Sequence, residues 1–218
     1  KADQNNSYIY ITPYLDECTR VIQECSEKHF VQPDAEAMGT KSRHFKHLIT
    51  KERNIASTHS LFKRMDQETR DLLSVKDYVL ILDEVMDVVE VVNITPRDLQ
   101  ILKENFIEIN EHNEITWKDK SYNGKYNEYK NLCDEGMLVL ISNTVVMWKF
   151  PAEVFNYFKE VYILTYMFDS QIQKYYFDYY NIEYNYRSID RDQNNNYMLV
   201  DRGSSTYEFK KKEQVKDL

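Results

Sequence analysis

Short apolar runs alternate with longer amphipathic stretches through most of the chain. The runs have the length and side-chain types of β-strands, and the stretches between them place apolar residues at helical spacing. The four clearest runs are Ser7–Thr12, Asn54–Thr58, Tyr78–Leu82 and Val161–Thr165. Strands that alternate with helices predict an α/β domain of three layers, with a mainly parallel sheet between two layers of helices.

The segments between these runs carry helix and hairpin signals of their own. Asp66 and Thr95 are placed to cap helices, and Pro96 occupies the favoured first helical position. A tight connection between Met137–Ile141 and Val145–Trp148 predicts a hairpin. The predicted helices cover residues 14–29, 42–50, 60–65, 67–73, 97–105, 125–134, 151–158 and 170–180. The polar stretch over residues 111–124 predicts an excursion from the sheet.

Composition and charge narrow the functional classes. The chain has 218 residues, of which 42% are hydrophobic and 29% charged, as in a globular protein. Its 28 basic and 36 acidic residues give a net charge of −8, which argues against a generic basic coat for nucleic acid but allows a local basic groove. No apolar run approaches the roughly 20 residues that span a bilayer, so no membrane partner is expected. Three cysteines without metal spacing, and no signal peptide, favour the cytoplasm.

The strand at Tyr78–Leu82 ends in two carboxylates, Asp83 and Glu84. Ligands of open α/β sheets bind outside the carboxyl ends of the strands, and in P-loop NTPases a carboxylate there helps hold Mg²⁺. Two adjacent carboxylates point in different directions, so one can serve a metal while the other reaches a water molecule. The pattern suggests nucleotide hydrolysis. An ordinary strand followed by an acidic helix start is the alternative.

A phosphate-binding loop is missing from the sequence. The four glycines, Gly39, Gly124, Gly136 and Gly203, fit no G-x-x-x-x-G-K-[ST] motif. The chain also begins with Lys1 and enters a strand almost at once. We expect a fragment truncated at its N-terminus, whose upstream sequence holds the loop. A domain that never had the loop is the other interpretation.

The four strand ends, read in chain order, resemble a known family. The pieces Ile9–Pro13, Ile55–His59, Val79–Glu84 and Val161–Tyr166 each end in small hydroxyl or acidic residues. Their succession resembles the first RecA-like lobe of superfamily 2 helicases, the DEAD/DEAH-like group. The likeness is greatest to phage and prophage proteins related to replication-origin-binding helicases, and it spans roughly residues 7–190. The fold that this resemblance implies is a RecA-like P-loop NTPase lobe.

The resemblance also implies roles for individual residues. Asp83 would hold Mg²⁺, usually through water, and Glu84 would orient or activate the hydrolytic water. Thr165 would link the state of the nucleotide to the strand-separating parts. Two departures from the family pattern are Val85-Met86 after the carboxylates and Leu-Thr-Tyr around Thr165.

On the nucleic-acid side, the family pattern matches Thr12 and Pro13 to one motif that touches the backbone, and Ser57 and Thr58 to the next. Strand termination explains Thr12 and Pro13 equally well. Capping of the following helix is the stronger explanation for Ser57 and Thr58. His59 and Asp83 end consecutive strands and could approach each other.

The resemblance implies ATP and Mg²⁺ as cofactors, and DNA, single-stranded or at a duplex junction, as partner. It also implies a second RecA-like lobe in the same protein and a bacterial or phage-infected cytoplasm. Residues 1–189 would form the helicase lobe, and residues 190–218 a polar linker or the start of a second domain. The chain would be a fragment of an ATP-dependent helicase or translocase. The alternatives are a non-catalytic lobe that docks DNA or a replication partner, and another α/β enzyme with a metal at the acidic strand end.

Overall fold

The computed structural model describes residues 6–201, which form two compact units divided between Phe177 and Asp178. The division falls within helix α8 (Ile172–Tyr179). The expected helicase lobe over residues 1–189 and the linker after it stay a prediction. No helix within residues 6–201 is long and apolar enough to cross a membrane.

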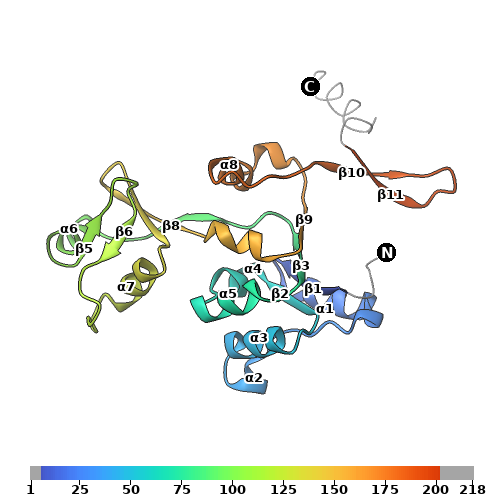
Figure 1. Ribbon diagram of the computed structural model, residues 1–218, viewed down its shortest axis with the longest axis horizontal. Helices are drawn as coiled ribbons and strands as arrows, with labels where there is room; N and C mark the ends of the chain where they lie inside the picture. The colour runs from blue at the N-terminus through green and yellow to red at the C-terminus, as the bar shows by residue number, and fades with distance from the viewer. Residues whose placement is uncertain (1–5, 202–218) are drawn as a thin grey trace. The chain divides into compact units, whose positions relative to one another are not determined.

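A four-stranded parallel sheet organises the first unit (Figure 1). Its strands are β1 (Ser7–Thr12), β2 (Ile55–Thr58), β3 (Tyr78–Asp83) and β9 (Glu160–Leu164), in the order β2-β1-β3-β9. All three pairings are parallel. The prediction of an α/β fold around a mainly parallel sheet is therefore confirmed.

Both faces of the central strands are buried, which explains their continuous apolar sequences. Helix α1 (Leu15–Glu24) covers one face, where Cys18 and Val21 pack with Tyr8, Tyr10 and Val79 of the sheet. The side chains that alternate with these point to the opposite face and are fully buried: Ile9, Ile11, Ile55, Leu80 and Leu82. Each stabilises the fold by roughly 1.5–3 kcal/mol relative to exposure to water.

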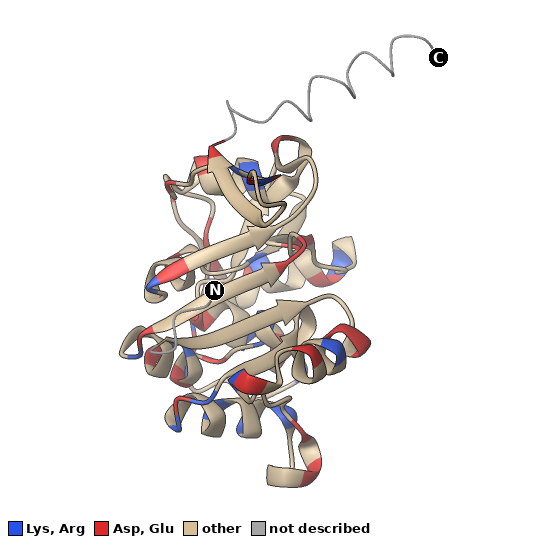
Figure 2. Cartoon of the chain, turned by 90° about the vertical axis from the view of Figure 1, so that its right-hand side faces the viewer, with Lys and Arg blue, Asp and Glu red and all other residues tan. Residues whose placement is uncertain are grey.

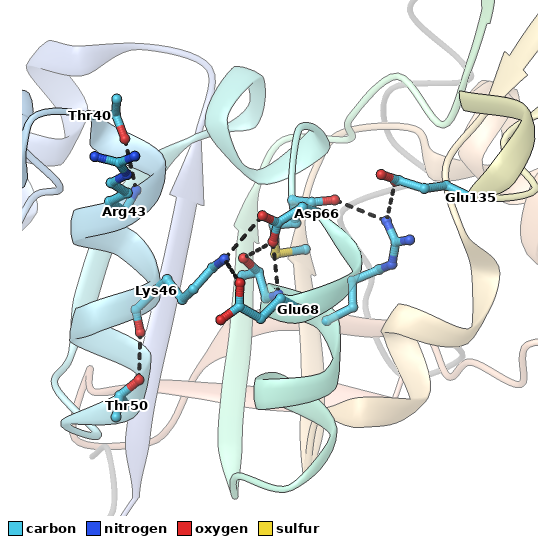
Figure 3. Close-up of polar contacts among 10 residues, drawn as sticks. Thr40, Arg43, Lys46, Thr50, Asp66, Glu68 and Glu135 are labelled. Carbon is cyan, nitrogen blue, oxygen red and sulfur yellow. Dashed lines mark hydrogen bonds and ion pairs between the residues drawn. The ribbon is translucent and has the colours of Figure 1, made fainter. Parts of the chain in front are cut away.

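Helix α3 (Lys41–Thr50) precedes β2 in the chain, and α4 (His59–Lys63) and α5 (Gln67–Ser74) follow it. Asp66 accepts a hydrogen bond from the Thr69 amide at 2.9 Å, which confirms its predicted role as the cap of α5. Lys46 of α3 reaches Asp66 at 3.1 Å and also pairs with Glu68 (Figure 3). These ion pairs fasten α3 to the start of α5.

An inserted region lies between β3 and β9 and has its own core. It contains β4 (Val89–Val91), α6 (Pro96–Asn105), β5 (Ile107–Ile109), β6 (Ile115–Trp117), α7 (Asn127–Asp134), β7 (Leu138–Ile141) and β8 (Val145–Lys149). Strands β7 and β8 form the predicted hairpin, and β4 adds to β8 in an antiparallel sheet. Thr95 caps α6 as predicted, accepting from the Asp98 amide at 3.1 Å. The core gathers Leu99, Leu102, Trp117 and Leu138 among others.

Arg70 of α5 joins the inserted region to the parallel-sheet part. It is 2% exposed, and its guanidinium donates to the Met65 carbonyl at 2.9 Å and to Glu135 at 3.2 Å. A buried guanidinium is costly unless it is paired, so loss of Glu135 would leave an uncompensated charge.

The segment between β8 and β9 corrects one prediction. A helix was expected over residues 151–158, and the chain instead forms a 3₁₀ helix, η2 (Ala152–Tyr157). Its Phe155 lies 5.5 Å from Phe150 and 4.9 Å from Phe177, ring centre to ring centre, and Phe150 stacks on Phe62 at 5.7 Å. These aromatic rings form core.

The remaining short elements of the first unit are 3₁₀ helices η1 (Ser26–Lys28) and η3 (Phe168–Ser170) and helix α2 (Ala35–Met38). Figure 2 shows that Lys, Arg, Asp and Glu gather on the helices and loops, whereas the strands of the sheet carry few charges. The charged faces are therefore the solvated faces of the fold.

The second unit contains a β-hairpin. Strands β10 (Arg187–Arg191) and β11 (Tyr197–Asp201) pair antiparallel, with an ion pair between Arg187 and Asp201 at 2.6 Å. The loop that joins the two strands covers residues 192–196. Residues 202–218, which belong to the expected linker or second domain, lie outside the described residues.

Candidate functional site

The four parallel strands place their carboxyl ends along one edge of the sheet. Thr12 pairs with Thr58 across β1 and β2, and Asp83 pairs with Leu164 across β3 and β9. The residues that the sequence singled out therefore lie at the same edge. Parallel sheets bind ligands outside this edge.

Asp83 is the last residue of β3 and is half-buried. Tyr10, on the neighbouring strand β1, shares a hydrogen bond with its carboxylate. Burial, together with this hydrogen bond and the nearby negative charge, raises the pKa of Tyr10 well above its usual value. Tyr10 thus stays protonated and can donate to the Asp83 carboxylate. The sequence alone did not reveal Tyr10 as part of the site.

Glu84 follows directly and has an unusual backbone. Its φ of 69° lies in the left-handed region, which costs a non-glycine residue about 1–3 kcal/mol. Two contacts with the end of β9 hold it there. Its amide donates to the Leu164 carbonyl at 2.9 Å, and its carboxylate accepts from the Thr165 hydroxyl at 2.9 Å. The structure therefore brings the two predicted catalytic residues, Glu84 and Thr165, into direct contact.

His59 approaches the same strand end from the other side. Burial lowers the pKa of its imidazole, and a hydrogen bond to the backbone of Asp83 opposes that effect in part. The neutral ring donates to the Asp83 carbonyl, so its Nε2 atom is an acceptor. That atom is buried and has no hydrogen-bond partner within the described part of the chain. The approach of His59 to Asp83 was an open possibility in the sequence.

The expected nucleic-acid residues differ in their exposure. Thr12 is 0% exposed and Ser57 is 2% exposed, so neither hydroxyl reaches solvent. Thr58 accepts from the Leu61 amide at 3.4 Å and caps α4, as the alternative interpretation had it. Pro13 is exposed and lines a groove.

The groove has a volume of about 710 Å³ and lies between α4 and the inserted region. One wall carries Pro13, His59, Ser60, Lys63 and Arg64, and the other carries Asp87, Glu90, Glu128, Glu135 and Trp148. Lys63 crosses the groove. It pairs with Asp87 at 3.3 Å and with Glu90, and its ammonium lies 5.9 Å from the centre of the Trp148 ring.

The donor set at the end of β3 fits Mg²⁺. Among residues 6–201 there is no group of three or more His, Cys, Asp and Glu side chains that could enclose a metal. Mg²⁺ does not need such a cage, since one or two carboxylates, waters and substrate phosphates usually hold it. Asp83 and Glu84 supply the oxygen donors that Mg²⁺ prefers.

Two comparisons with known proteins give matches. A family model described as the YonV middle domain matches residues 89–148, which run from the start of β4 to Trp148 in β8. The SPbeta prophage-derived uncharacterized protein YonV of Bacillus subtilis (strain 168) is 38% identical over 212 residues, covering 92% of this chain and 51% of that protein. The chain thus spans about half the length of this curated relative. No solved structure matches.

The match to the family model coincides with the inserted region, which has its own core cluster. The wider match to the relative covers 92% of the chain. The prophage source of the relative is in keeping with the bacterial or phage setting expected from the sequence.

Proposed function

We propose that the parallel-sheet part is a RecA-like lobe that supplies the Mg²⁺ and water side of an ATP site. The full protein would be an ATP-dependent DNA helicase or translocase of phage replication, with a second RecA-like lobe. The observation that carries the proposal is the position of Asp83 and Glu84 at the carboxyl tip of β3, with Glu84 held by Thr165, which directly follows the neighbouring strand β9.

Asp83 and Glu84 would have different roles in the ATP site. Asp83, steadied by Tyr10, would hold Mg²⁺ through a water molecule. Glu84 would orient the attacking water, and its left-handed backbone and the Thr165 hydrogen bond would fix its carboxylate relative to β9. When bound, Mg²⁺ neutralises charge on the phosphates, because phosphoryl transfer is catalysed mainly by positioning and electrostatics.

The nucleic-acid track would run along the α4 wall of the groove. Pro13 lines the groove, and Arg64 offers a cation to a phosphate backbone. Thr12, Ser57 and Thr58 would contribute by shaping this wall from beneath, since the first two are buried and the third caps α4. Binding would weaken as salt rises, because phosphate contacts release counterions.

The test is ATP hydrolysis by the longer natural polypeptide with and without single-stranded DNA. Asp83→Asn is expected to lower turnover by at least about 100-fold, while the fold and melting temperature are kept. Asp77→Asn, an exposed carboxylate just before the amino end of β3, is the matched control and should keep turnover. Unchanged turnover in Asp83→Asn would refute the metal role.

The 218-residue chain alone is expected to bind ATP weakly and to hydrolyse almost none, since its sequence holds no phosphate loop. Turnover near 10 s⁻¹, the ordinary enzyme median, would contradict this expectation.

A non-catalytic docking lobe is the second candidate, and the missing loop motif is the observation that favours it. This candidate predicts salt-sensitive DNA binding by the longer polypeptide without any ATP hydrolysis. The two proposals are separated by measuring both activities on one preparation.

A further inference from the structure

Helix α3 presents a basic face that lies outside the site at the tip of β3. Arg43, His47 and Lys51 are exposed, and each lies four residues from the next. Residues at this spacing share one side of a helix, so the three form a line about 12 Å long. The apolar residues of α3 are buried in the fold: Phe45, Leu48 and Ile49.

A hollow of about 460 Å³ adjoins this line. Its lining consists of Val31, His44, His47, Leu48, Lys51 and Arg53. No carboxylate lines it within the described part of the chain. The Nδ1 atom of His44 accepts from the Asp34 amide at 2.9 Å, which leaves the Nε2–H of the ring as a donor. Cations and an N–H donor without a carboxylate suit an anion.

The cations of this face are not neutralised inside the protein. Within residues 6–201, the side chains of Arg43, Lys51 and Arg53 form no ion pair. Lys46 and Lys76, by contrast, pair with carboxylates, and Arg43 points away from the carboxylates that bind Lys46 (Figure 3). Free cations gathered on one helix are unexpected in a chain whose net charge is −8.

The start of α3 also opposes helix electrostatics. The macrodipole favours carboxylates in the first turn of a helix and disfavours cations there. Helices α1, α5 and α6 each have an acidic residue in the first turn. The first turn of α3 has none and contains Lys41 and Arg43. Local helix stability therefore does not account for these two cations.

We propose that the α3 face, formed by Arg43, His47, Lys51 and Arg53, binds the phosphate backbone of a nucleic acid. Basic side chains hold phosphate oxygens in place, and a line about 12 Å long can engage successive phosphates along a strand. A lipid surface fits less well, because helices that lie on membranes turn an apolar face toward lipid, and that of α3 is buried.

The α3 face takes DNA as its partner from the proposed function but is a different site. The hollow beside α3 and the groove beside α4 share no described lining residue. Contact at α3 therefore does not depend on ATP hydrolysis at the tip of β3, nor on the track along the α4 wall.

The test is titration of a fluorescein-labelled oligothymidylate with the longer natural polypeptide at several salt concentrations. The triple variant Arg43→Gln, Lys51→Gln, Arg53→Gln is expected to bind at least about 10-fold more weakly, with its plot of log affinity against log salt shallower by about 2. The swap Arg43→Lys, Lys51→Arg, Arg53→Lys keeps the charges and should bind within about threefold of the wild type.

The matched control removes three exposed charges from the inserted region: Arg97→Gln, Lys118→Gln, Lys120→Gln. It should keep the salt slope of the wild type. An unchanged slope in the α3 variant, or an equal loss in the control, would overturn the proposal. So would displacement of the strand by polyglutamate at equal charge, since the face would then prefer an acidic polypeptide.

Arg64→Gln tests the track of the proposed function separately. Weaker binding in Arg64→Gln together with an unchanged α3 variant would refute the α3 site and leave the track standing. Weaker binding in the α3 variant alone would support the α3 site and count against the track.

Discussion

The carboxyl edge of the sheet has two halves that look alike in sequence and differ in structure. At the ends of β1 and β2, the hydroxyls of Thr12 and Ser57 are buried and Thr58 caps a helix. At the ends of β3 and β9, Glu84 is exposed, has a positive φ and accepts a hydrogen bond from Thr165.

The difference separates strand ends whose polar residues only terminate the strand or cap a helix from strand ends whose carboxylates are exposed and held in place. Small polar residues terminate strands in both halves. Only in the β3–β9 half is a strained backbone held by contacts from a neighbouring strand, and such strain persists where the surroundings over-determine it.

The largest effect is expected for Glu84→Gln in the longer polypeptide. Loss of a group that orients the attacking water should lower the turnover of ATP by about 100-fold or more, with nucleotide affinity retained. Steady-state hydrolysis and nucleotide titration measure the two quantities. Glu108→Gln, an exposed carboxylate of β5, is the control. If Glu84→Gln keeps wild-type turnover, the ends of β3 and β9 have only a structural role, like the ends of β1 and β2.

Thr12→Val should stabilise the protein. The Thr12 hydroxyl is buried with no hydrogen-bond partner in the described part of the chain, so the near-isosteric valine removes an unsatisfied polar group. We expect the free energy of unfolding to rise by about 1 kcal/mol, with DNA affinity unchanged, as urea unfolding and a DNA titration can show. A loss of DNA affinity would instead give Thr12 a direct role in binding.

Thr58→Ala should lower the free energy of unfolding by about 1 kcal/mol, because α4 loses its cap. Thr58→Ser keeps a capping hydroxyl and is expected to stay near the wild-type stability. If both variants unfold like the wild type, the Thr58 hydroxyl is free for another partner and the contrast between the halves weakens.

The smallest effect concerns pH. Burial lowers the pKa of His59 in the folded protein. Below about pH 6.5, His59 therefore binds a proton in the unfolded chain but stays neutral in the folded protein until the pH is lower still. Stability contributed by neutral His59 is therefore full above pH 6.5 and is lost as pH falls below it, with a slope of at most about 1.4 kcal/mol per pH unit. Urea unfolding of His59→Gln between pH 7 and 5 should show a shallower slope. If both proteins show the same slope, the pH dependence of unfolding comes from a group other than His59.

Much of the fold was accessible from sequence because the central strands are buried on both faces. Continuous apolar runs placed β1 and β3 within one residue of their observed ends, and Asp66 and Thr95 were found as caps because their chemistry is local. Strands β4 and β6 were missed. Each has three residues, and its pairing is fixed by partners elsewhere in the inserted region.

The site was accessible only in part. Asp83 and Glu84 stood out because carboxylates rarely end an apolar run. The positive φ of Glu84 and the hydrogen bond from Tyr10 to Asp83 are products of cross-strand packing, and no local pattern encodes them. The exposure of Pro13 beside the burial of Thr12 likewise depends on how the sheet is covered.

The most direct measurement is an experimental structure of the longer polypeptide with ADP and Mg²⁺. The account predicts a Mg²⁺ ion one water molecule away from the Asp83 carboxylate, with Glu84 facing the position of the terminal phosphate. A nucleotide bound away from the tip of β3, or a metal ion with no water bridge to Asp83, would contradict it.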